Sequence, residues 1–142
     1  MKKIYTLILL SISISFSAQV EGTWRLAQIP GALAVGPTQT DYSWWSSSAT
    51  DINSRACLFD DSVTFYANGN FTHYMDGNTW LEPFQGVTSE QCGSPVAPHD
   101  GNGPYTYVYT NNQLTVNGSG AHIGLAKVVN LGEISTGSPV PS

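Results

Sequence analysis

Short runs in which apolar and polar residues alternate dominate the chain, and Asn, Gly and Asp separate them. No segment keeps an apolar period of 3.6 residues over the length of an ordinary helix. This pattern predicts antiparallel strands, so we expect an all-β fold, either barrel-like or a sandwich. A first strand is expected over residues 22–26. The Pro- and Gly-containing segment 28–56 is expected to be a long irregular loop, and such loops are often functional.

The segment 63–74 predicts a hairpin together with its register. A three-residue loop ending at Gly69, with that glycine at positive φ, keeps one face of the hairpin apolar. A two-residue loop at Asn68 and Gly69 would mix apolar and polar residues on both faces. The favoured register pairs Phe65 with Phe71 and Val63 with His73. Its second face carries Tyr66 and Tyr74. This face could be a platform for a sugar, but we expect a second sheet to cover it.

A second hairpin is predicted over residues 105–117. Its turn is Asn111–Asn112, because asparagine tolerates the left-handed region that a tight hairpin turn requires. This register pairs Tyr109 with Leu114 and Tyr107 with Val116. A further strand is expected over roughly 121–129. Residues 132–142 are rich in Ser, Pro and Gly and are expected to form a flexible tail, which would leave an open sheet edge.

The N-terminus has the pattern of a secretory signal peptide. Two lysines precede an apolar run over residues 4–12, and small residues follow up to Ala18. The run is shorter than the roughly 20 residues of a membrane-spanning helix. We therefore expect a signal peptide at 1–18, cut at one of two adjacent bonds, a single β-domain at 19–131, and a secreted protein without membrane insertion after cleavage.

Charge and cysteines refine this picture. Without residues 1–18 the chain keeps three basic residues and all ten acidic ones, which argues against nucleic acid as a partner. The two cysteines, Cys57 and Cys92, belong to an exported chain, where disulfides persist, so we expect them to be bonded.

The segment 41–48 is the strongest indication of a binding site. It places two adjacent indoles, Trp44 and Trp45, among small polar residues. Neighbouring residues of an extended chain point to opposite sides, so an ordinary half-buried strand hides only one of the two rings. The other ring needs a second layer or a ligand, and both interpretations remain open. Aromatic rings flanked by hydroxyls and a carboxylate suit a carbohydrate.

The remaining polar residues give weaker indications. The carboxylates at 41, 51, 60 and 61 fit no calcium-binding loop signature, so they either bind calcium or cap turns. The three histidines are scattered along the chain and no CxxC spacing exists, which argues against a metal cofactor. The glutamates show no spacing that places two of them across a cleft, and His99-Asp100 suits a turn as well as a base. We therefore expect a protein that is not an enzyme.

Several motifs support a resemblance. Gly22-Thr23-Trp24, Phe65-x-x-x-Gly69-x-Phe71 and the Tyr-rich hairpin resemble the lipocalin-like (calycin-type) β-domains of secreted bacterial proteins. A closer resemblance is to an extracellular bacterial module often joined to family 16 glycoside hydrolases or adhesion repeats. It rests on Ala32-Leu33-x-Val35-Gly36-Pro37, Ser43-Trp44-Trp45-Ser46, Arg55-Ala56-Cys57-x-Phe59-Asp60-Asp61, Thr79-Trp80-Leu81-Glu82 and Pro95-Val96-Ala97-Pro98-His99-Asp100-Gly101. This resemblance implies association with glycans and with catalytic or adhesion modules.

Three functional hypotheses follow. The first is a domain that binds polysaccharide through Tyr42, Trp44 and Trp45, with Asp41 and Asp60 accepting hydrogen bonds from sugar hydroxyls. The second is a lipocalin-like carrier of a small apolar ligand, in a cavity lined by Trp24, Phe65, Phe71 and Trp80. The third is a structural or adhesive module with no small ligand. The exposure of Trp44 and Trp45 is the observation that best separates them.

Overall fold

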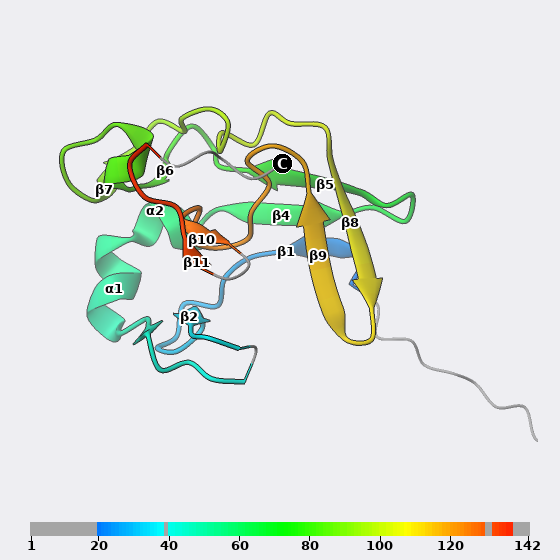
Figure 1. The fold of residues 1–142 in the computed structure, drawn as a ribbon, viewed down its shortest axis with the longest axis horizontal. Coiled ribbons are helices and arrows are strands. Elements are labelled where there is room, and N and C mark those ends of the chain that lie inside the picture. The colour runs from blue at the N-terminus through cyan, green and yellow to red at the C-terminus, as the bar shows by residue number, and fades with distance from the viewer. Residues whose placement is uncertain (1–19, 39, 130–131, 138–142) are drawn as a thin grey trace, which may run out of the picture.

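The computed structural model describes residues 20–38, 40–129 and 132–137. Its main element is an antiparallel sheet of five strands in the order β1-β4-β5-β8-β9. These strands span Gly22–Trp24, Ser62–Phe65, Asn70–Tyr74, Tyr105–Thr110 and Gln113–Asn117. The sheet is strongly twisted, since β8 and β9 run steeply across the ends of the other three strands (Figure 1). The described residues are predominantly β and form no closed barrel.

Both predicted hairpins have the expected register. In β4 and β5, Phe65 pairs with Phe71 and Val63 with His73, and Gly69 has a φ of 83°. In β8 and β9, Tyr107 pairs with Val116 and Tyr109 with Leu114. The turn between them places Asn111 and Asn112 at φ values of 51° and 59°. Local turn chemistry and alternating polarity determine both registers.

Shorter elements surround the sheet. Segment 28–56 is more ordered than expected, because it holds two short strands and leads into two short helices. Those elements are β2 (Ala34–Val35), β3 (Trp45–Ser46), α1 (Ala49–Ser54) and α2 (Ala56–Phe59). Beyond β5 the chain forms β6 (Thr79–Leu81), η1 (Pro83–Gln85) and β7 (Gln91–Gly93). The last pair is β10 (Val128–Val129) with β11 (Gly132–Glu133).

Three other expectations need correction. The strand expected over 121–129 is a loop that ends in the two residues of β10. The expected tail is paired at its start, since Gly132 and Glu133 pair with β10 and Ile134 is buried. Tyr66 and Tyr74 are exposed rather than covered by a second sheet. The expected signal peptide and residues 138–142 lie outside the described residues.

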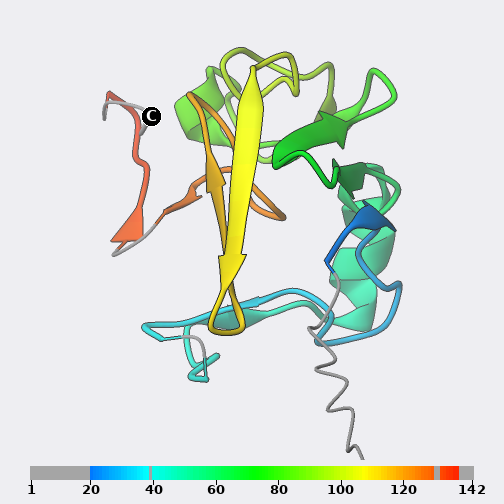
Figure 2. The same ribbon diagram turned by 90° about the vertical axis from the view of Figure 1, so that its right-hand side faces the viewer.

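The buried apolar side chains form two clusters. Phe65, Phe71 and Tyr105 pack on the inner face of the five-stranded sheet. Leu58 and Phe59 of α2 form the second cluster with Leu125. The two helices lie at the far end of the sheet from the β8–β9 turn (Figures 1 and 2). The predicted disulfide joins Cys57 of α2 to Cys92 of β7. No helix among the described residues has the length and apolar character needed to cross a membrane.

Candidate functional site

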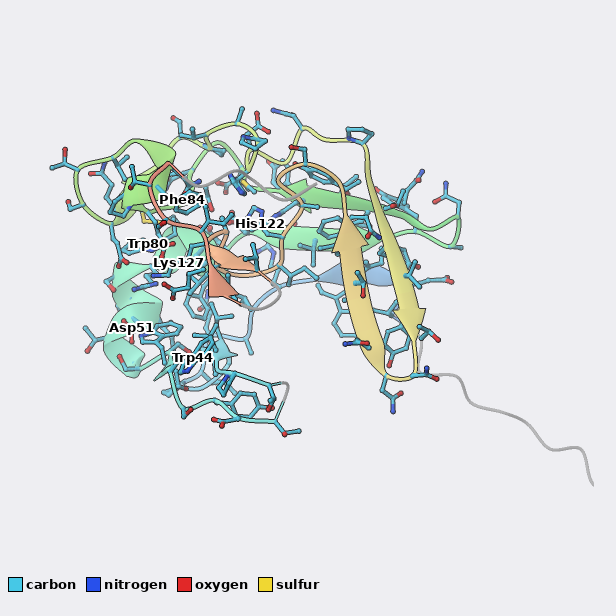
Figure 3. The ribbon with its side chains drawn as sticks, in the orientation of Figure 1. Trp44, Asp51, Trp80, Phe84, His122 and Lys127 are labelled. Carbon is cyan, nitrogen blue, oxygen red and sulfur yellow. A yellow bond between two sulfur atoms is a disulfide. The ribbon has the colours of Figure 1, made fainter. Side chains whose placement is uncertain are left out.

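The aromatic residues of segment 41–45 are divided between solvent and the protein interior. Tyr42 is 60% exposed and Trp44 is 55% exposed, whereas Trp45 is half-buried. Tyr42 and Trp44 lie in the turn that precedes β3, whereas Trp45 is the first residue of that strand. Figure 3 shows Trp44 near the bottom of the molecule, below Asp51 of α1. Trp45 is therefore packed against the protein and Trp44 is exposed, and a ligand on Trp44 stays a prediction.

The backbone around these rings folds back tightly on itself. Residues Thr38 and Asp41 form a bridge, and a carboxylate oxygen of Asp41 accepts a hydrogen bond from the Ser43 amide at 2.9 Å. Gly36 lies against this turn so closely that a Cβ there would collide with the carbonyl oxygen of Asp41. These contacts hold the backbone of the turn that carries Tyr42 and Trp44 in place.

Trp45 packs against an arginine held between two indoles. The guanidinium of Arg55 lies 4.9 Å from the ring centroid of Trp45 and 4.5 Å from that of Trp80. Its Nη2 donates to Glu90 Oε2 at 3.1 Å. Such stacking is a cation–π contact, and arginine suits it because its planar group is weakly hydrated. Trp45 is therefore part of the packed framework that supports the exposed rings.

The carboxylates expected to accept hydrogen bonds lie in different places. Asp41 belongs to the aromatic turn. Asp60 is exposed at the C-terminal end of α2, where its charge acts on neighbouring Asp61. Asp51 caps α1 and accepts hydrogen bonds from both the amide and the hydroxyl of Ser48. Asp51 thus has the capping role that was left open, and sugar binding by Asp41 and Asp60 stays a prediction.

A buried carboxylic acid was not foreseen from the sequence. Asp61 precedes β4, and its Oδ2 accepts a hydrogen bond of 2.6 Å from the hydroxyl of Thr79. Nε2 of His73 lies 4.0 Å from the same oxygen. Burial, assisted by the charges of Asp60 and Asp76, raises the pKa of Asp61 to about 7. Burial lowers the pKa of His73 to about 3, so this histidine is neutral at pH 7.

The three histidines, scattered in sequence, are brought together in space. The ring of His122 lies 4.7 Å from that of His73 and 5.6 Å from that of His99. Burial lowers the pKa of His122 to about 4 and lowers that of His99 as well. Gly120 allows this arrangement, because a Cβ there would collide with the carbonyl oxygen of Pro98. Close approach of two loops, which no local pattern encodes, assembles the cluster above β5.

A buried ion pair lies on the other side of this cluster. Glu82 is 2% exposed, and Nζ of Lys127 lies 3.3 Å from its Oε1. Burial raises the pKa of Glu82, and the charge of Lys127 opposes that change. The same ammonium group lies 3.8 Å from Glu90, the partner of Arg55. Lys127 therefore links the loop after β9 to the segments around β6 and β7.

One pocket of about 100 Å³ opens over the sheet. It lies between β1, β4 and β5 on one side and residues 123–124 on the other. Of the four residues expected to line a carrier cavity, only Trp24 does so. Phe65 and Phe71 are core residues, and Trp80 stacks on Arg55. Ligand pockets usually enclose roughly 300–1,000 Å³, so this one suits only a small molecule.

Within the described part of the chain, no group of three or more His, Cys, Asp and Glu residues has the geometry to hold a metal ion. The calcium site considered at residues 41, 51, 60 and 61 is not assembled either, because these residues have the separate positions given above. Comparison of the chain with protein family models, with curated proteins and with solved structures gives no match.

Proposed function

We propose that this protein is a secreted, non-catalytic domain that binds extracellular polysaccharide through Tyr42 and Trp44. The observation that carries the proposal is that two aromatic side chains, both more than half exposed, lie two residues apart in a single turn. Rings in this position offer flat apolar faces to the CH groups of sugar rings. Asp41 and the serines beside them offer hydrogen-bond partners for the hydroxyls.

The framework beneath supports this role. Trp45, Arg55 and Trp80 are stacked, so the turn is attached to the body of the protein through the neighbour of Trp44. A ligand site on a supported turn loses less conformational freedom on binding than one on an unsupported loop. The disulfide also supports export to an oxidising compartment. Such a domain would hold an adjoining glycoside hydrolase or adhesion module close to a glycan surface.

Retention on polysaccharide tests this function. We expect the wild-type protein to be retained on soluble or insoluble β-glucans in a pull-down. Ring stacking contributes roughly 0.5–1.5 kcal/mol, so Trp44→Ala should weaken retention by about twofold to tenfold. Its free energy of unfolding should change by less than about 0.5 kcal/mol because the ring is exposed.

Tyr74→Ala is the matched control, since Tyr74 is also an exposed aromatic residue but lies on β5. Trp45→Ala is a second comparison and should destabilise the fold, because this ring packs on Arg55 and the core. Equal retention of the Trp44→Ala variant and the wild type would refute the proposed site. Loss of binding in Tyr74→Ala alone would move the site to the outer face of the sheet.

A further inference from the structure

The pocket over the sheet is built from one row of side chains. Trp24 of β1 pairs with Val63 of β4, and Val63 pairs with His73 of β5, so the three share a face of the sheet. Leu58 and Ile123 contribute apolar side chains to the lining of the pocket, and Asp61 contributes a carboxyl group. The indole of Trp24 is 52% exposed. The pocket is thus an apolar hollow with an aromatic rim and ionisable residues in its lining.

Two of those lining residues have buried polar atoms without partners. Oδ1 of Asp61 and Nδ1 of His73 have no hydrogen-bond partner within the described residues. The side chains are only 4% and 3% exposed. An unpaired buried polar atom destabilises a protein by about 1–3 kcal/mol, so each such atom needs an explanation, for example a bound water, an ion or a ligand.

The charges around Asp61 indicate what that ligand is. The residues facing the carboxyl group are Thr79, neutral His73 and the acidic residues Asp60 and Asp76. Arg25 lines the pocket but is exposed to solvent, and no lysine or arginine forms an ion pair with Asp61 in the described segments. An ionised Asp61 is therefore a buried negative charge without a counter-ion, which proteins rarely tolerate.

We propose that this pocket binds a small primary ammonium compound with a short aliphatic body. The ammonium group lies beside the carboxylate of Asp61 in the pocket lining and supplies the missing positive charge. The aliphatic part lies against Leu58, Val63 and Ile123, and the ring of Trp24 at the rim favours a cation. An anionic ligand is disfavoured because Asp60, Asp61 and Asp76 all repel it.

Titration calorimetry with ethylammonium chloride tests the proposal, at an ionic strength held constant with sodium chloride. We expect saturable binding at pH 8. Because Asp61 has a raised pKa, the affinity should fall by about tenfold for each pH unit below pH 7. Ethanol has the same number of non-hydrogen atoms and no charge, and it should bind at least tenfold more weakly at pH 8.

Variants locate the site. Asp61→Asn keeps the shape of the side chain and an oxygen for Thr79, and it should weaken ethylammonium binding at pH 8 by tenfold or more. Val63→Phe should fill the pocket and also abolish binding. Glu133→Gln removes an exposed carboxylate elsewhere and should have no effect. Three results would overturn the proposal: no binding by the wild type, unchanged binding in either pocket variant, or equal binding of ethanol.

Discussion

The ionisable residues inside this protein have pKa values shifted in opposite directions by one cause. Burial favours the neutral form of each group, so it raises the pKa of Asp61 and lowers the pKa of His73, His99 and His122. At mildly acidic pH the folded protein therefore keeps Asp61, His73 and His122 neutral. The unfolded chain would hold the same histidines protonated and the same aspartate ionised.

These shifts predict how stability depends on pH. Between about pH 4 and 6.5 the unfolded chain carries protons on the histidines that the folded protein lacks, so acidification destabilises the fold. Asp61 acts in the opposite sense, because the folded protein holds its proton up to about pH 7 while the unfolded chain releases it near its model value of 3.8. The histidines outnumber it, so the net stability should fall on acidification below pH 6.5.

Asp61→Asn isolates the carboxyl contribution. The variant should match the wild type near pH 4 and gain about 1.4 kcal/mol per pH unit up to pH 7 relative to it, because asparagine lacks the carboxyl group whose ionisation in the unfolded chain destabilises the wild type as the pH rises. Urea unfolding at several pH values between 4 and 8 measures the difference. A stability difference that stays constant across this range would contradict the assigned shift.

For single residues, the sequence predicts the exposure of one indole but not the contacts of the buried histidines and Asp61. The expectation that one indole would be exposed could be made locally, since two adjacent residues of an extended chain face opposite sides. The meeting of His73, His99 and His122 could not, because their elements are separated by long stretches of chain and come together through loop packing. The burial of Asp61 likewise brings in Thr79, which lies 18 residues further along the sequence.

The secondary-structure elements that could be predicted are those whose geometry depends on residues close together in sequence. The two hairpins were placed with their registers because turn residues and alternation act over a few positions. The helices α1 and α2 were missed, since six and four residues are too few to show a helical period. A signal did exist: Ser48 and Asp51 form a capping box, which can be recognised from the spacing Ser-x-x-Asp.

The turn between β8 and β9 makes a quantitative prediction. Asn111 and Asn112 both have positive φ, which glycine adopts with less strain than asparagine. We expect Asn112→Gly to stabilise the protein by roughly 0.5–1 kcal/mol. Thermal or urea unfolding measures the change. Thr115→Gly is the control in the middle of β9 and should destabilise, because glycine weakens a strand interior.

For the molecule as a whole, the β6–β7 region is held by several kinds of contact. The Cys57–Cys92 bond ties it to α2, and Arg55 and Lys127 tie it to the segments on either side. The sequence predicted the disulfide from the compartment alone. It did not predict the charged contacts, because Glu90 and its partners Arg55 and Lys127 are 35 or more residues apart in sequence.

Removing the disulfide should lower global stability. The bond closes a long loop, with a sequence separation of 35, so the double variant Cys57→Ser and Cys92→Ser should lose roughly 3–4 kcal/mol of unfolding free energy. Urea unfolding of the variant and of oxidised and reduced wild type measures this. The reductant should leave the variant unchanged. A reduced wild type as stable as the oxidised one would contradict the expected contribution.

The tight packing of Gly36 against the carbonyl of Asp41 has a consequence for how this surface tolerates sequence change. Only glycine at position 36 allows the backbone to pass this close to Asp41 and Tyr42. The positions of the Tyr42 and Trp44 rings therefore depend on Gly36, a residue with no side chain to contact a ligand. Any larger residue at 36 must displace the turn and with it the spacing between ring and carboxylate. A substitution at Gly36 can therefore alter the proposed glycan site while every aromatic residue is kept.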